Sequence, residues 1–191
     1  MKEISSFFSS EVFRPIVTLI IPGTTATVFY LLSLQCLLKK HIEPLNSLGT
    51  YQGTIILFFV FVSAGLIIEN IGSMIECHID EKLDKESNGK HDSDWYEYLR
   101  LAFKYEPVGH RYLRTVVFRL KFELAFGIGS LFAIPGLIWY LNIKSVDCCY
   151  YWLAMLFAVV GFFLLVEAKR SAVVLSRVRA EILKGITMIG D

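Results

Sequence analysis

Four uncharged, mostly apolar stretches constrain this chain more than any other feature. They cover residues 16–38, 48–68, 124–143 and 148–166. Each is close to the length of helix, about 20 residues, that crosses a hydrocarbon core about 30 Å thick. With 54% hydrophobic residues in a chain of 191, a water-soluble domain would expose large apolar patches. We therefore expect an all-α membrane protein with four transmembrane helices.

The positive charges predict how these spans are oriented. Of the 19 Lys and Arg residues, only Lys39, Lys40 and Lys144 lie in the first and third connections between spans. The other sixteen (19 minus 3) lie before the first span, between the second and third, or after the fourth. Because cytoplasmic segments carry an excess of Lys and Arg, we expect a multi-pass inner-membrane protein with both termini in the cytoplasm.

This topology divides the chain into five expected segments. They are an interfacial N-terminal arm (1–15), a first transmembrane hairpin (16–72), a cytoplasmic helical module (73–123), a second transmembrane hairpin (124–168) and a cytoplasmic C-terminal helix (169–191). Inside the module, we expect a polar link over 84–94 and then a helix over 95–105, with Tyr98 on its buried face.

Proline–glycine pairs interrupt the first and third spans, as Pro22-Gly23 and Pro135-Gly136. Three threonines follow the first pair (Thr24, Thr25 and Thr27). Their hydroxyls can bond backbone carbonyls near the proline, which predicts a stabilised kink. A broken helix lining a polar pathway is the alternative. The recurrence of the pair also suggests a weak duplication of two spans plus two.

The second span continues into polar sequence without a helix breaker. Its polar residues share one helical face at i, i+4, i+7 and i+11: Glu69, Ser73, Glu76 and Asp80. A neighbouring face carries Ile68, Ile71, Ile75 and Ile79. This pattern predicts an amphipathic extension of the membrane helix, and its acidic face needs a partner.

A basic stretch leads into the third span. Its members are Arg111, Arg114, Arg119 and Lys121, and Glu123 follows them. One interpretation is that these cations contact anionic lipid headgroups. Another is that Arg114 or Arg119 reaches the acidic face of the second-span extension at Glu69 or Glu76. The carboxylates at the ends of the spans, which also include Glu167, are expected to pair with nearby Arg and Lys.

The last segment keeps a helical period and supplies Arg170, Arg177 and Arg179 as candidate contacts for a cytoplasmic partner protein. Small residues in the spans favour close approach of helices, and with it a homo-oligomer. They are Ser63, Ala64, Gly65, Gly127, Gly129 and Ser130.

The sequence contains no nucleophile motif, phosphate-binding loop or set of metal ligands at a recognisable spacing. We expect no catalytic residues, cofactor or metal, and no direct contact with nucleic acid, because the basic residues are interleaved with acids. Two alternatives to an anchoring role stay open. One is a pore-forming effector, with Glu69 side chains around the pore of an oligomer. The other is a lipid-modifying membrane enzyme.

In length, span number and topology, the chain resembles the small four-span membrane subunits of bacterial anti-phage operons, such as the membrane component of the Kiwa system. The resemblance covers the whole chain in outline and carries over no functional residue. It implies an oligomeric inner-membrane anchor or sensor that assembles with a soluble cytoplasmic partner during infection.

Overall fold

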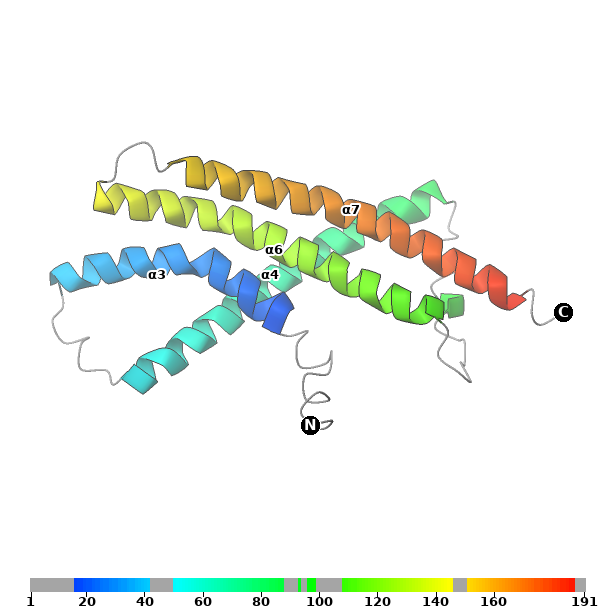
Figure 1. Cartoon of the computed structure of the whole chain (residues 1–191), viewed down its shortest axis with the longest axis horizontal. Helices are drawn as coiled ribbons and strands as arrows, with labels where there is room; N and C mark the ends of the chain where they lie inside the picture. Colours follow the sequence, from blue (N-terminus) through cyan, green and yellow to red (C-terminus); the bar gives the residue numbers. More distant parts are fainter. Residues whose placement is uncertain are drawn as a thin grey trace.

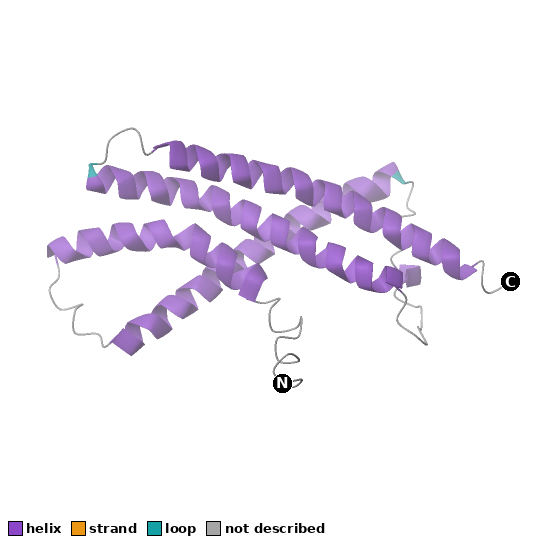
Figure 2. Ribbon diagram, viewed as in Figure 1, coloured by secondary structure: helices purple, strands orange, loops and turns teal. Residues whose placement is uncertain are grey.

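The computed structural model of the chain describes residues 16–41, 50–87, 93, 96–98, 108–145 and 151–187. These residues form a short π-helical segment, η1 (Ile16–Ile20), and four α-helices: α3 (Ile21–His41), α4 (Thr50–Glu86), α6 (Val108–Lys144) and α7 (Tyr151–Thr187). No strand occurs among the described residues (Figure 2). Four helices are long and apolar enough to cross a membrane, which confirms the predicted fold class. The expected N-terminal arm lies outside the described residues.

Three of the helices are much longer than a bilayer is thick. α4, α6 and α7 have 37 residues each, or about 55 Å at 1.5 Å per residue, against a hydrocarbon core of about 30 Å. Each divides into an apolar half and a polar half. The polar halves are residues 69–86 of α4, 108–123 of α6 and 167–187 of α7. The expected segment boundaries after residues 72, 123 and 168 therefore fall inside continuous helices.

α6 is the central helix of the bundle. It runs side by side with α7 and also packs against α3, while α4 crosses behind at a steep angle (Figure 1). More than half of the apolar segment of α6 is buried, but only 17% of the corresponding segments of α4 and α7. Bulky apolar side chains on α4 and α7 are therefore exposed, among them Phe58, Phe59, Trp152, Met155 and Phe162. A lipid environment accommodates such surfaces, whereas water does not.

Small residues lie where helices of this one chain meet. A Cβ on Gly129 of α6 would come within 2.8 Å of the Pro22 carbonyl oxygen. Between α6 and α7, a Cβ on Gly127 would lie 3.2 Å from the Gly161 carbonyl oxygen. Ser130 is fully buried. The close approach that these residues predict occurs within the chain, so Gly127, Gly129 and Ser130 do not supply the expected contact between copies.

The first proline–glycine pair lies at the change from π-helix to α-helix. Pro22 is the second residue of α3, and α3 follows η1 directly. Two of the expected threonine bonds are present. Thr25 Oγ1 donates to the Ile21 carbonyl at 2.8 Å and Thr27 Oγ1 to the Gly23 carbonyl at 2.7 Å. These hydroxyls support the irregular turn from within its own helix, and no polar pathway is needed to account for them.

The second pair has a different setting, inside the continuous helix α6. The Tyr30 ring of α3 covers Gly136, where a Cβ would come within 2.7 Å of ring carbons. The Tyr30 hydroxyl donates to the Phe132 carbonyl at 3.2 Å, in the turn before Pro135. Proline withdraws a donor from that turn, and Tyr30 supplies one from the neighbouring helix. The two pairs therefore have different surroundings in the two halves of the chain.

The backbone contact at Gly129 predicts a stability effect. In Gly129→Ala the new methyl group meets the Pro22 carbonyl rather than a flexible side chain, and overpacking of this kind costs about 1–3 kcal/mol. We expect a lower thermal unfolding temperature in detergent. Gly53→Ala is the matched control, because nothing lies within 4 Å of the added Cβ and alanine favours helix by up to about 1 kcal/mol. Equal unfolding temperatures for the two variants would contradict the close packing.

Candidate functional site

The ion pairs described by the structure gather where the apolar halves of α6 and α7 end. Glu123 is 4% exposed and accepts hydrogen bonds from Arg119 Nε at 2.6 Å and Ser171 Oγ at 2.7 Å. Arg119 Nη2 also lies 3.5 Å from Glu167 Oε2, and Arg170 Nη1 lies 2.6 Å from Glu167 Oε1. We call these five residues the boundary network. It joins α6 to α7 at the level where apolar sequence gives way to polar sequence.

The boundary network corrects the part of one interpretation of the basic stretch that concerns Arg119. Arg119 reaches Glu123 and Glu167, and not Glu69 or Glu76 of α4. The physical reason is that residues four apart share one face of a helix. Arg119 and Glu123 lie on the face of α6 that meets α7, so α4 is out of reach. Pairing of Glu123 and Glu167 with nearby arginines confirms the simpler expectation for these carboxylates.

The other two arginines of the basic stretch are Arg111 and Arg114. The Arg114 side chain is exposed, and the side chain of Arg111 lies outside the described residues. Neither forms part of the boundary network.

The polar half of α4 is amphipathic, as its sequence predicts. Ile68, Ile71 and Ile75 pack with Ala125 and Ile128 of α6. Ile75 and Ile79 continue the contact against a second cluster that α6 and α7 build together, formed by Leu120, Leu124, Ala168 and Ala172. This apolar face packs α4 against the other two long helices. The acidic face of α4 lies beside that contact and not within it.

Three members of the acidic face, Glu69, Ser73 and Glu76, line a narrow cleft between α4 and α6. The opposite wall includes Lys121, a cation that the sequence places on the basic stretch but does not assign to α4. No ion pair with Glu69 occurs within the part of the chain that the structure describes.

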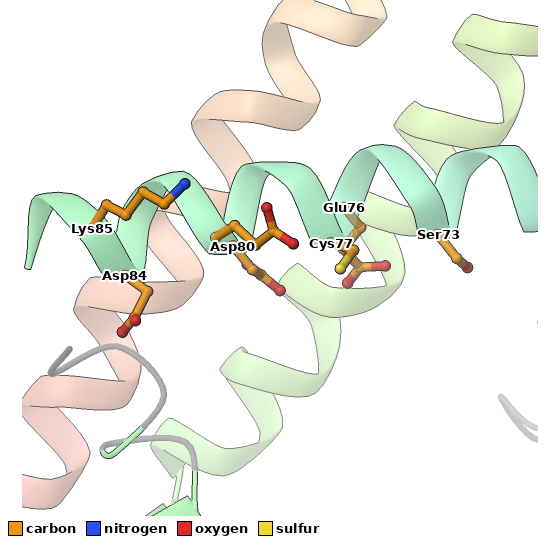
Figure 3. A pocket seen from close by; sticks show the side chains of 7 residues that line it. Ser73, Glu76, Cys77, Asp80, Asp84 and Lys85 are labelled. Carbon is orange, nitrogen blue, oxygen red and sulfur yellow. The ribbon is translucent and has the colours of Figure 1, made fainter.

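A larger hollow of about 470 Å³ lies farther along the polar half of α4. We call it the acidic hollow. The α4 side chains that line it are spread over about three turns and are shown in Figure 3: Ser73, Glu76, Cys77, Asp80, Glu81, Asp84 and Lys85. Four of the seven are carboxylates and one is a cation. Such a surface attracts cationic groups, and Lys85 at one end limits the direction from which they can approach.

Glu76 belongs to both the cleft and the acidic hollow. It lies about two turns beyond the apolar segment that ends at Ile68. Burial raises the pKa of its carboxyl above the usual 4.5, and this outweighs the opposing attraction of Lys121, while Asp80 adds a smaller upward shift. Glu76 is therefore a partly desolvated carboxylate.

The tail helix packs by the face that its period predicts. Val178, Ile182 and Leu183 contact Leu113 of α6 and the buried ring of Tyr98. Tyr98 is thus buried as expected, although most of the helix expected over 95–105 lies outside the described residues.

The three candidate arginines of the tail are not equivalent. Arg170 and Arg177 are exposed, but Arg179 is only 4% exposed. Arg179 is therefore part of the interior of the polar half, and the surface available to a partner presents Arg170 and Arg177. Periodicity alone could have indicated this, because position 179 lies seven residues after Ala172 and four before Leu183, which are both buried.

Sequence reasoning did not find Ser171 or Cys77, and it did not assign Lys121 to α4. Ser171 follows Glu167 by one helical turn, which is a signal of a shared face. Its bond to Glu123, however, crosses from α7 to α6, and no spacing within one helix predicts such a bond. Across the described segments, no group of three His, Cys, Asp or Glu side chains is arranged to hold a metal ion.

The burial of Glu123 predicts that its removal is costly. In Glu123→Ala the hydroxyl of Ser171 loses its acceptor, and leaving a buried polar group unsatisfied costs about 1–3 kcal/mol. The Arg119 side chain is 60% exposed, so water replaces much of its lost partner and limits the penalty. We expect a clear fall in thermal stability in detergent. Glu167→Gln, at the more accessible end of the network, is the comparison variant and should lose less.

The raised pKa of Glu76 predicts a pH-dependent gain on substitution. An acid whose pKa is higher in the folded state destabilises the fold when ionised, and this cost disappears as pH falls below the usual value. Glu76→Gln should therefore raise the unfolding temperature at neutral pH, with a difference from wild type that shrinks toward pH 4.5. Glu81→Gln, at an exposed position, serves as control. A gain of the same size at both pH values would contradict the burial argument.

Comparisons of the chain with protein-family models, curated proteins and solved structures found no match.

Proposed function

We propose that this protein is an anchor and sensor in the bacterial inner membrane, with both termini in the cytoplasm, and that it assembles with a cytoplasmic partner protein. The polar halves of α4, α6 and α7 form the working surface in this proposal. The apolar halves hold that surface at the membrane, and self-association of the chain is part of the proposed assembly.

One observation carries the proposal. A hollow of about 470 Å³ belongs to the polar half of α4, where Glu76, Asp80, Glu81 and Asp84 gather. The polar half of α7 presents Arg177 at its surface. Acidic and basic surfaces on neighbouring helices suit a partner that carries the complementary pattern, and charge patterning of this kind governs which partner binds and how fast.

The resemblance to four-span subunits of anti-phage operons gives this proposal a biological setting. The proposed role in bacterial defence rests on that outline alone. Anionic lipids are proposed as a second partner, because Arg119 and Arg170 are largely exposed at the end of the apolar halves, where headgroups would lie.

A pore-forming effector is the main rival. The described apolar halves contain no charged side chain near their centres, and the buried hydroxyls of Ser33 and Ser130 are satisfied by carbonyls of their own helices. A conducting path would then have to lie between copies of the chain. Depolarisation of cells on expression, abolished in Glu69→Gln, would favour the pore over the anchor.

Charge reversal on the tail tests the anchoring proposal without unfolding the helix. Deleting the tail would also remove Leu183 and Val178 from the apolar cluster around Tyr98, so a point substitution is cleaner. We expect Arg177→Glu to lower, by about tenfold or more, the amount of partner that co-purifies in mild detergent, since an unfavourable charge at an interface costs several kcal/mol.

Lys144→Glu is the matched control. Lys144 is also an exposed cation, but it ends α6 at the opposite end of the molecule, beside the connection to α7. It should leave co-purification unchanged. Equal loss in both variants, or loss in neither, would count against a partner bound at the polar halves.

A further inference from the structure

α4 is attached to the rest of the chain differently from the other helices. α3, α6 and α7 lie alongside one another, whereas α4 crosses them (Figure 1). In that view the N-terminal end of α4 diverges from α3, and its C-terminal end projects past α7. α4 is also continuous from Thr50 to Glu86 and contains no proline, the usual cause of a sharp kink.

The crossing is made by backbone against backbone. A Cβ on Gly65 of α4 would overlap the Leu19 carbonyl of η1 and lie 2.9 Å from the Leu19 Cα. A Cβ on Gly23 would overlap the Phe61 carbonyl and lie 2.7 Å from the Gly65 nitrogen. No side chain of either glycine stands between the two helices. Interlocked side chains are what normally restrict the angle between packed helices, so this contact leaves the angle comparatively free.

The segment on the other side of the crossing is irregular as well. Leu19 belongs to the π-helical η1, which ends two residues before Pro22. π-Helical segments are rare and are frequent at functional sites. The carbonyl that touches Gly65 therefore belongs to the least regular part of the described bundle.

Two arms of α4 extend from this crossing. The apolar arm, from Tyr51 to Gly65, is about 21 Å long and is poorly covered, with Tyr51 86% and Phe59 63% exposed. The polar arm, from Gly65 to Glu86, is about 31 Å long and carries the acidic hollow. Its attachment to α6 and α7 includes an apolar face of isoleucines.

We propose that α4 is a lever that pivots at Gly65 and couples the state of the membrane around its apolar arm to the position of the acidic hollow. A change of tilt of about 10° moves the end of a 21 Å arm by about 3.5 Å and the end of a 31 Å arm by about 5 Å. Bilayer thickness and lipid packing act on the tilt of exposed membrane helices. The lever goes beyond the anchoring proposal and does not depend on which partner binds.

Because α4 and α7 cross, the lever predicts that their ends on both sides of the crossing approach or separate together. Two pairs of spin labels measure this, in a variant whose four native cysteines are replaced by alanine. The apolar pair is Ile56→Cys with Met155→Cys, and the polar pair is Lys82→Cys with Arg177→Cys. All four positions are exposed. Distances are measured by pulsed electron paramagnetic resonance in lipid nanodiscs.

The added methyl group of Gly65→Ala forces the crossing to move, because it meets backbone atoms of Leu19. We expect both label distances to shift in the same sense by several ångströms. Gly53→Ala, on the same helix with nothing within 4 Å, should leave both distances unchanged. A shift of only one pair would show a bend at Gly65 and overturn the lever, as would no shift at all in a folded Gly65→Ala protein.

A second measurement needs no change at the crossing. The same two distances are compared in short-chain and long-chain phosphatidylcholine nanodiscs, with Gly65 intact. The lever predicts a joint shift of both pairs with bilayer thickness. Polar-pair distances that do not change while the apolar pair shifts would overturn the proposal, even if Gly65→Ala fails to fold.

Discussion

Three helices of this chain must each change solvent partway along their length. A continuous 37-residue helix is about 55 Å long, so when its apolar half lies in a hydrocarbon core of about 30 Å the rest must face water or protein. The boundary network lies where the two environments meet on α6 and α7. There the buried carboxylate of Glu123 is satisfied by Arg119 and Ser171, which meets the requirement that charge near lipid be paired.

α6 can lie at the centre of the bundle because small residues on its surface let the neighbouring helices approach closely. Gly127 receives Gly161 of α7, and Gly129 and Gly136 receive Pro22 and Tyr30 of α3. In lipid, where water does not drive apolar surfaces together, close contact of this kind is what holds helices to one another. The glycines that could have packed two copies together instead pack the helices of one copy. The exposed faces of the helices carry bulky apolar side chains.

The functional interpretation rests on the contrast between the two halves of the molecule. The apolar halves supply no charged site near their centres, whereas the polar halves combine the acidic hollow of α4 with exposed arginines of α7. α4 belongs to both halves and crosses the bundle through the bare backbone at Gly65. A proposed anchor and sensor thus has a physical route from its membrane surroundings to its partner surface.

The helices, and the solvent that each half faces, follow from the order of the amino acids. An uncharged stretch of about 20 residues in lipid must satisfy its backbone internally, which leaves the helix as the structure available to it. The spacing of Ile68, Ile71, Ile75 and Ile79 also determined which face of α4 is buried.

What lies opposite each face depends on how the helices pack against one another. Arg119 contacts Glu167 and not Glu69, and Arg179 is buried. Gly65 and Gly129 lie at contacts between segments of the same chain. The physical reason is that periodicity specifies directions around the axis of one helix. The neighbour met in each direction depends on crossing angles, and these depend on how the side chains of segments far apart in the sequence pack together.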